Sequence, residues 1–220
     1  QWLGVGYRKS EKLASVADAK GYFVDALSRT HLRPADYKRL SSRGEEAIER
    51  YLNVRAGSFS KTDLIERGFN NEGVVVADAR LSGKIDKLSY LTANTAQVVD
   101  FKTGKPATSW QGKDDFEKIK LHKYRQQLMF YKLLVENSAS FTGKLTVNNG
   151  ALEFIEPNDQ GEMVNNLEIT FDANDLAHFT KLVGAVWQHI ADLNFPDVTK
   201  YPQSLKGIQQ FEQDLIDDTI

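Results

Sequence analysis

The sequence of 220 residues contains no cysteine. Structural disulfides and thiolate metal sites are therefore excluded. Carboxylates, histidines, amides and backbone oxygens remain as possible metal ligands, and the four histidines show no paired metal-binding spacing. Because oxygen ligands suit hard cations, we expect any bound metal to be Mg²⁺ or Mn²⁺.

Long apolar runs are also absent. No stretch approaches the ~20 residues that a helix needs to cross a bilayer, and the first ten residues lack the apolar core of a secretory signal. We therefore expect a soluble, cytoplasmic protein. The chain begins at Gln1 rather than at a methionine, which we interpret as a domain excised from a longer protein.

The charge balance gives no overall attraction to nucleic acid, because 28 basic residues face 30 acidic ones and the net charge is −2. A nucleic-acid partner would have to use a local patch. One candidate patch lies near Trp110 and Tyr124 and contains Lys113, Lys118, Lys120, Lys123 and Arg125. The alternative interpretation of such a run is a solvated helix face.

Hydrophobic residues make up 41% of the chain, and no internal repeat or low-complexity linker interrupts it. We therefore predict a single domain over residues 1–220. Residues 1–62 would form its helical N-terminal part and residues 63–136 the core that carries its motifs. Residues 137–220 would add further strands and the closing helices.

Helical patterns cover residues 11–28 and 34–54, the second with Pro34 in its first turn. Gly44 inside the second helix costs about 1 kcal/mol relative to alanine, which indicates close approach by another backbone or a ligand. From Asp63 the pattern changes to β-rich runs separated by turn residues. These runs, which predict an antiparallel meander, are DLIERGF, GVVVADARL, GKIDKLSYL and AQVVDFK.

Helical spacing returns at residues 114–136, and the runs GKLTVNN, ALEFIEP and NLEITF follow as predicted strands. A last helix opens at Asp172, a suitable N-cap. It carries an apolar stripe, interpreted as core, of Leu176, Phe179, Val183, Val186, Ile190 and Leu193. The predicted fold class is α/β or α+β, with helices flanking a central mixed sheet.

Asp100 and Lys102 in VVDFKTG point to the same side of a strand, because strand side chains alternate between faces. Phe101 then points the other way, into the core. Asp86 lies in the preceding run GKIDKL, and the short connection allows the two strands to be hairpin neighbours. We therefore expect Asp86 and Asp100 to converge at one edge of the sheet.

Two carboxylates brought together repel, so they need protonation, a salt bridge or a cation, and a divalent ion is the simplest solution. Such an ion polarises a phosphodiester and helps a bound water to ionise, while a lysine orients that water. Asp86, Asp100, Lys102 and the backbone carbonyl of Phe101 form a sufficient set. The alternative is two turn-flanking acids and an exposed lysine, but both acids interrupt apolar strand contexts.

Three motifs in this order, GKIDKL, VVDFKTGK and YRQQLMFYKLL, resemble those of RecB-like nucleases of the PD-(D/E)xK superfamily, which occur fused to UvrD-like DNA helicases. The resemblance covers residues 63–136 and implies a restriction-endonuclease-like fold. It also implies a Mg²⁺- or Mn²⁺-dependent deoxyribonuclease that acts in DNA repair or recombination. Helicase domains in the same parent chain and a bacterial cytoplasmic location follow from the same resemblance.

The resemblance implies roles for individual residues. Asp86 and Asp100 would be metal ligands, and Lys102 would be the catalytic lysine. Gln127 and Tyr131 match a glutamine and a tyrosine that the family carries four residues apart, and this spacing places both on one helix face. There Gln127 could order the lysine or a DNA phosphate, whereas the alternative is a surface glutamine beside a core tyrosine.

The chain also departs from the family pattern. Ile48 stands where the first motif usually has a histidine, and Glu45 and Glu49 on the same helix are possible substitutes, with an exposed acidic face as the alternative. Glu66 falls where these proteins often carry a strand glutamate. The cysteines that hold an iron–sulfur cluster in some relatives are absent, so no cluster is expected.

Two other functions stay open at this point. One is a nuclease-like module that holds DNA without cleaving it, favoured by Ile48 and opposed by the retained acids and lysine. The other is a scaffold domain that docks a partner through residues 176–193, which would leave that stripe exposed. If the protein is a nuclease, we expect phosphate contacts from Lys118, Lys120, Lys123 and Arg125.

Overall fold

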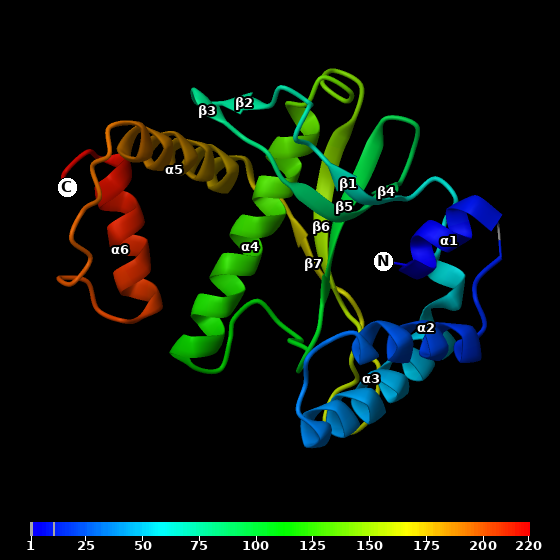
Figure 1. Ribbon diagram of the computed structural model, residues 1–220. Coiled ribbons are helices and arrows are strands. Elements are labelled where there is room, and N and C mark those ends of the chain that lie inside the picture. Colours follow the sequence, from blue (N-terminus) through cyan, green and yellow to red (C-terminus); the bar gives the residue numbers. More distant parts are fainter. Residues whose placement is uncertain (1, 11) are drawn as a thin grey trace.

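The computed structural model describes residues 2–10 and 12–220 and shows a sheet between two layers of helices (Figure 1). The helices are α1 (Trp2–Ser10), α2 (Val16–Ser28), α3 (Pro34–Arg55), α4 (Asp115–Glu136), α5 (Ala173–Ala191) and α6 (Leu205–Ile216). A short 3₁₀ turn, η1 (Ala56–Ser58), follows α3. The strands are β1 (Leu64–Gly68), β2 (Val75–Val76), β3 (Ala79–Arg80), β4 (Lys84–Tyr90), β5 (Thr95–Lys102), β6 (Thr146–Phe154) and β7 (Leu167–Thr170).

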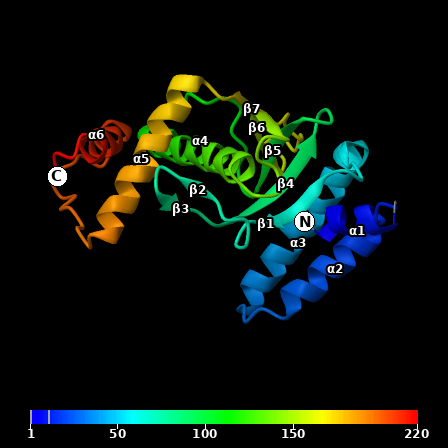
Figure 2. The same cartoon turned by 90° about the horizontal axis from the view of Figure 1, so that it is seen from above.

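The central sheet has five strands in the order β1-β4-β5-β6-β7. β5 and β6 run parallel, and the other neighbours are antiparallel. Helices α1, α2 and α3 cover one face and α4 covers the other, while α5 and α6 lie on the outer side of α4 (Figure 1 and Figure 2). The expected class, a mixed sheet flanked by helices in a restriction-endonuclease-like arrangement, is confirmed.

The predicted meander is interrupted between its first and third runs. β4 and β5 are antiparallel neighbours as predicted, but GVVVADARL forms a separate two-stranded hairpin of β2 and β3, so β1 pairs with β4 instead. Ala77 and Asp78, the two residues between these strands, both have positive φ angles, of 47° and 66°. A two-residue turn with this backbone closes a hairpin on itself, which explains why the run leaves the central sheet.

The runs GKLTVNN and ALEFIEP were predicted as two strands, and this is wrong, because both contribute to the single strand β6. Gly150 joins the two runs within this strand and lets α4 approach, since a Cβ at Gly150 would lie 3.1 Å from the Cβ of Leu128. A glycine inside a strand often marks such close packing.

The N-terminal helix was predicted to start too early. Residue 11 lies outside the described residues, and residues 12–15 are not helical. Helix α2 begins at Val16 because Ser15, in an extended conformation, caps it by accepting a hydrogen bond from the Asp18 backbone N–H at 3.1 Å. Helix α1 was not predicted, whereas α3 agrees with its prediction.

Helix α4 lies between the sheet and the C-terminal helices. Asp114 caps its start by accepting a hydrogen bond from the Glu117 backbone N–H at 2.8 Å. Leu121, Leu128 and Val135 recur every seven residues along it and are buried in the same core as the sheet. The sides of α4 that face away from this core carry polar side chains.

The apolar stripe of the last predicted helix is only partly core. Asp172 caps α5 as predicted, accepting from the Asn174 N–H at 2.8 Å, and Phe179 is buried. Val186, Ile190 and Leu193 are exposed instead, and Leu193 lies beyond the end of the helix with a φ of 54°. Among residues 2–10 and 12–220, no helix is both long and apolar enough to cross a membrane.

Gly44 is needed where α2 and α3 cross. A Cβ at Gly44 would lie 2.2 Å from Cζ of Phe23, far inside van der Waals contact. The close approach at Gly44 is therefore made by an aromatic side chain of α2, and not by another backbone or a ligand as predicted. Nothing lies within 4 Å of the corresponding Cβ position at Gly21, a second glycine inside a helix.

We expect Gly44→Ala to lower the free energy of unfolding by about 1–3 kcal/mol, because the added methyl group overpacks the α2–α3 contact. Gly21→Ala is the matched control. It should raise stability by up to about 1 kcal/mol through helix propensity alone. Urea denaturation of both variants measures the difference, and a stabilised Gly44→Ala protein would contradict the helix packing described above.

Candidate active site

Acidic side chains form a row across three neighbouring strands. The β1–β4 register pairs Ile65 with Lys87 and Arg67 with Ile85, which places Glu66 opposite Asp86. The β4–β5 ladder ends where Lys87 pairs with Val99, and one step further Asp86 lies opposite Asp100. The three strands are adjacent and β4 and β5 are internal, so the two aspartates meet at the end of a ladder and not at an outer edge of the sheet.

Asp86 is held by the next strand. Its Oδ2 accepts a hydrogen bond from the backbone N–H of Phe101 at 2.9 Å. The pKa of Asp86 is raised, mainly by burial and further by the charges of Asp100 and Glu66, although the Phe101 N–H and Lys102 oppose the rise. Like charges therefore do gather at this position.

Asp100 and Lys102 form a closed ring of contacts with two residues of α4. Lys102 Nζ lies 2.6 Å from Asp100 Oδ2, and it donates a hydrogen bond to Gln127 Oε1 at 2.8 Å. Gln127 Nε2 donates to the Tyr131 hydroxyl at 3.2 Å, and that hydroxyl donates to Asp100 Oδ1 at 3.0 Å. The two-residue period of β5 and the four-residue spacing on α4 bring these four side chains to one place.

Tyr131 acts as a hydrogen-bond donor in this ring. Its pKa is raised, first by burial and then by the charges of Asp100 and Asp86. The phenol therefore keeps its proton at neutral pH. It can fix the orientation of Asp100 without adding charge to the site.

Tyr124 is a member of the site that the sequence did not assign. Lys102 Nζ lies 4.0 Å from the centroid of the Tyr124 ring, so the ring supports the lysine from one side. The pKa of Tyr124 is raised by burial and by the charge of Asp100. The available signal was its spacing of seven residues from Tyr131, which places both on one helix face.

The oxygen atoms at the end of β4 and β5 fit a hard divalent cation. Lys102 O accepts a hydrogen bond from Ile155 N on the β6 side at 3.0 Å. Because backbone groups of successive strand residues face opposite ways, the carbonyl of Phe101 faces β4, where Asp86 lies. Two carboxylates and one carbonyl would offer oxygen ligands only, which would suit a hard cation such as Mg²⁺.

No group of three or more His, Asp or Glu side chains that could hold a metal ion occurs in the described part of the chain. Glu66 is near Asp86, but its carboxylate pairs with Lys84. Its Oε1 is buried and has no hydrogen-bond partner within residues 2–10 and 12–220. Glu66 has a φ of 56°, a backbone conformation that non-glycine residues rarely adopt.

The three candidate residues on α3 are not brought to this cluster. Glu49 pairs with Lys20 of α2 at 2.5 Å, and Glu45 accepts a hydrogen bond from Ser41 within α3 at 2.9 Å. Ile48 lines an apolar cavity between the N-terminal helices and the sheet. The Glu49–Lys20 pair and the packing of Ile48 hold α3 against its neighbours, whereas the Glu45 contact stays within α3.

The basic run of α4 is divided between two flanks. Lys120 and Lys123 share the helix face of Gln127, and Lys120 Nζ lies 5.6 Å from the Tyr124 ring centroid. Arg125 faces the other way, 3.8 Å from Asp175 of α5 and 5.8 Å from the ring of Trp110. Of the proposed DNA contacts, Lys118 shares the Arg125 flank, with its Nζ 3.9 Å from Asp115.

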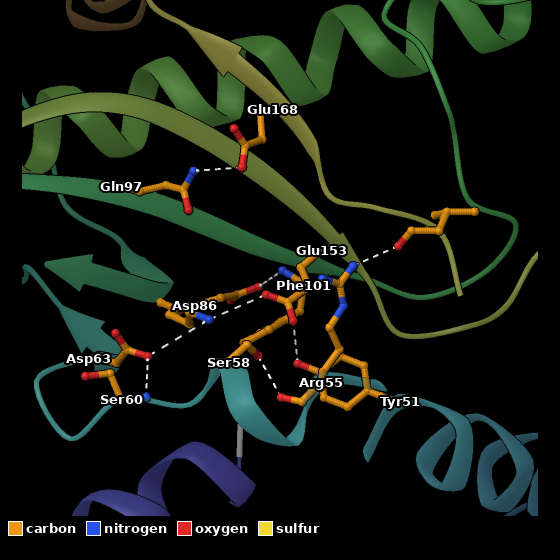
Figure 3. Close-up of polar contacts among 12 residues, drawn as sticks. Tyr51, Arg55, Ser58, Ser60, Asp63, Asp86, Gln97, Phe101, Glu153 and Glu168 are labelled. Carbon is orange, nitrogen blue, oxygen red and sulfur yellow. Dashed lines mark hydrogen bonds and ion pairs between the residues drawn. The ribbon is translucent and has the colours of Figure 1, made fainter. Parts of the chain in front are cut away.

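A buried ionic cluster lies on the opposite face of the sheet, and the sequence did not identify it (Figure 3). Tyr51 donates a hydrogen bond to Glu153 Oε1 at 2.6 Å. Lys87 Nζ lies 3.5 Å from Glu153 Oε2 and 4.0 Å from Asp63 Oδ2. Glu153 is 1% exposed. Its place in the apolar run ALEFIEP was a signal of the same kind as that of Asp86.

Phe101 lies between the buried cluster and the candidate active site. Lys87 Nζ lies 5.9 Å from the centroid of the Phe101 ring, on the face that looks toward α3. The backbone of the same residue meets Asp86. The position of the Phe101 backbone therefore depends on packing on both faces of the sheet.

A family model for the PD-(D/E)XK nuclease superfamily matches residues 6–204. The chain therefore belongs to the PD-(D/E)XK nuclease superfamily. Membership indicates nuclease activity, that is, hydrolysis of phosphodiester bonds, and members typically use divalent metal ions. A search of curated proteins gives no match.

We expect Lys87→Met to lower the free energy of unfolding by about 3–5 kcal/mol, because it leaves Glu153 and Asp63 buried without their cation. Lys105→Met is the matched control, since it breaks an exposed pair with Asp159. That pair contributes about 0–1 kcal/mol. Chemical denaturation compares the two variants, and equal losses would mean that the cluster around Lys87 contributes no more than a surface pair.

Proposed function

We propose that this chain is a DNA nuclease that depends on Mg²⁺ or Mn²⁺, with its active centre at Asp86, Asp100 and Lys102. The observation that carries the proposal is the closed ring of Asp100, Lys102, Gln127 and Tyr131 beside Asp86. A lysine fixed by two partners next to converging carboxylates is preorganised for reaction at a phosphate. Superfamily membership supports the same assignment.

Each residue has a distinct part in the proposed mechanism. Asp86, Asp100 and the Phe101 carbonyl would hold a divalent ion, which polarises the phosphoryl oxygens and helps a bound water to ionise. The Lys102 ammonium orients the attacking water or stabilises the negative charge that develops in the transition state. Gln127 and Tyr124 keep the ammonium in place. Tyr131 and Gln127 are positioning residues that act through Asp100 and Lys102.

We further propose that the protein is of the RecB-like type and works beside helicase domains in DNA repair or recombination. The order of the three motifs on β4, β5 and α4 supports the type. DNA as substrate is supported by Lys120 and Lys123, which lie on the face of α4 that carries Gln127. With a net charge of −2, such local cations must provide the attraction to phosphate.

The proposed ligands are tested by metal binding. Asp86→Asn and Asp100→Asn should each weaken Mn²⁺ affinity by at least about tenfold, the lower bound for loss of residues that merely support metal ligands. Asp86→Asn should stay folded, because loss of like-charge repulsion offsets part of the lost contacts. Asp100→Asn also removes the anion of Lys102 and should lower stability, which thermal melting measures. Asp159→Asn, an exposed carboxyl paired with Lys105, should bind as the parent does. Unchanged calorimetric affinity in both site variants would show that the metal binds elsewhere.

Lys102 is tested by separating turnover from affinity. Lys102→Ala should lose cleavage by orders of magnitude and keep most of its DNA affinity, because the lysine acts mainly in the transition state. Lys102→Arg should also be poor, since a guanidinium cannot occupy the point between Asp100 and Gln127. Lys144→Ala, a lysine in the connection between α4 and β6, should cleave as the parent does.

The assay is degradation of linear single- and double-stranded DNA with Mg²⁺ or Mn²⁺, with a chelator as control. Cleavage that survives Lys102→Ala would refute the proposed mechanism. No cleavage by the parent protein with either metal would indicate the module that holds DNA without turnover. Ile48, which lines an apolar cavity and offers no ligand, would then be the first residue to exchange.

A further inference from the structure

Phe116 has an unusual place for an aromatic side chain. It lies in the first turn of α4 and is 80% exposed. Its ring borders a hollow of about 540 Å³ between α4 and α6, lined also by Ile119, Val198, Tyr201, Ile208 and Phe211. The volume is within the range of pockets that hold small molecules.

The exposed ring lies on the helix face that leads to the candidate active site. Phe116, Lys120, Lys123 and Gln127 follow one another at spacings of four, three and four residues, so they share one face of α4. Tyr124 flanks the same face. The eight residues from Phe116 to Tyr124 correspond to about 12 Å along the helix axis.

The charges on this face are free to meet a polyanion. Arg125 on the other flank is occupied by Asp175, and Lys118 by Asp115. Lys120 and Lys123 have no ion-pair partner among the residues that the structure describes, and the contact recorded for Lys120 is with the Tyr124 ring. The face thus combines uncompensated cations with an exposed aromatic ring at its far end.

We propose that an unpaired DNA strand follows this face of α4 to the active centre, with one of its bases stacked on Phe116. Lysines that track the backbone and rings that stack on bases are the elements of single-strand binding. A paired base has its faces covered by its neighbours in the duplex, so the ring favours unpaired strands. The inference rests on the proposed DNA nuclease function and adds the strand state of the substrate and a contact remote from the site of cleavage.

The test measures fluorescence anisotropy of a labelled single-stranded oligonucleotide and of a blunt duplex, with a chelator to prevent cleavage. Phe116→Ala should bind the single strand about five- to a hundred-fold more weakly and the duplex equally well. Phe195→Ala removes another exposed ring, 71% exposed in the segment between α5 and α6, and should change neither affinity. Thermal melting checks that both variants remain folded.

Salt and base content separate stacking from charge. Phe116→Ala should keep the salt dependence of the parent, whereas Lys120→Ala and Lys123→Ala should each reduce the log–log slope by about 0.7 on a single strand. With an abasic oligonucleotide of the same length, the parent and Phe116→Ala should bind alike. An equal loss on normal and abasic strands would overturn stacking.

Two further outcomes distinguish a failure of base stacking on Phe116 from a failure of the proposed nuclease function. If the parent binds and cleaves DNA while Phe116→Ala matches it on every substrate, base stacking on Phe116 is refuted and the proposed nuclease function is retained. If the parent binds neither single strand nor duplex and cleaves neither with metal, the proposed nuclease function and base stacking on Phe116 are refuted together.

Discussion

The buried pair of Asp100 and Lys102 is the contact on which the site depends. Asp100 is 2% exposed, and a carboxylate at that depth is stable only with a cation and hydrogen-bond donors beside it. Lys102 supplies the cation from two residues further along the same strand. Tyr131 supplies the donor from α4, and Gln127 fixes both Lys102 and Tyr131. The docking of α4 on the sheet is therefore also the assembly of the site.

Strand β5 has charged side chains on one face and packs against a buried ionic cluster on the other. This explains why it lies inside the sheet with helices on both sides. Asp100 and Lys102 face α4, while Phe101 faces Lys87 and the helices of the N-terminal layer. The pairing of Lys87 with Glu153 joins β4 to β6 across β5. Both neighbours of β5 are thus linked beneath Phe101, whose carbonyl is a proposed metal ligand.

Much of this arrangement could be predicted from the sequence, because it depends on the regular residue spacing of a strand or a helix. The alternation of Asp100 and Lys102 and the four-residue step from Gln127 to Tyr131 need only strand and helix geometry. Tyr51 and Glu153 are 102 residues apart, and nothing local reveals that they meet. Helical spacing assigns each basic residue of α4 to a flank, but which flank is covered depends on α5 and α6, which no local pattern places.

The ends of β4 and β5 differ in charge from the face of α4 that ends in Phe116. Glu66, Asp86 and Asp100 at the end of the strands face Lys84 and Lys102, which leaves one net negative charge where a phosphate must come. A phosphodiester is repelled there unless a divalent cation reverses the sign. The acids of the first turn of α4, Asp115 and Glu117, lie on either side of the face that carries Phe116, Lys120 and Lys123. The two lysines make that face positive, so its contacts with a strand would not need the metal. In the proposed function, binding would begin along α4, and the cation would be required only where the strand reaches β4 and β5.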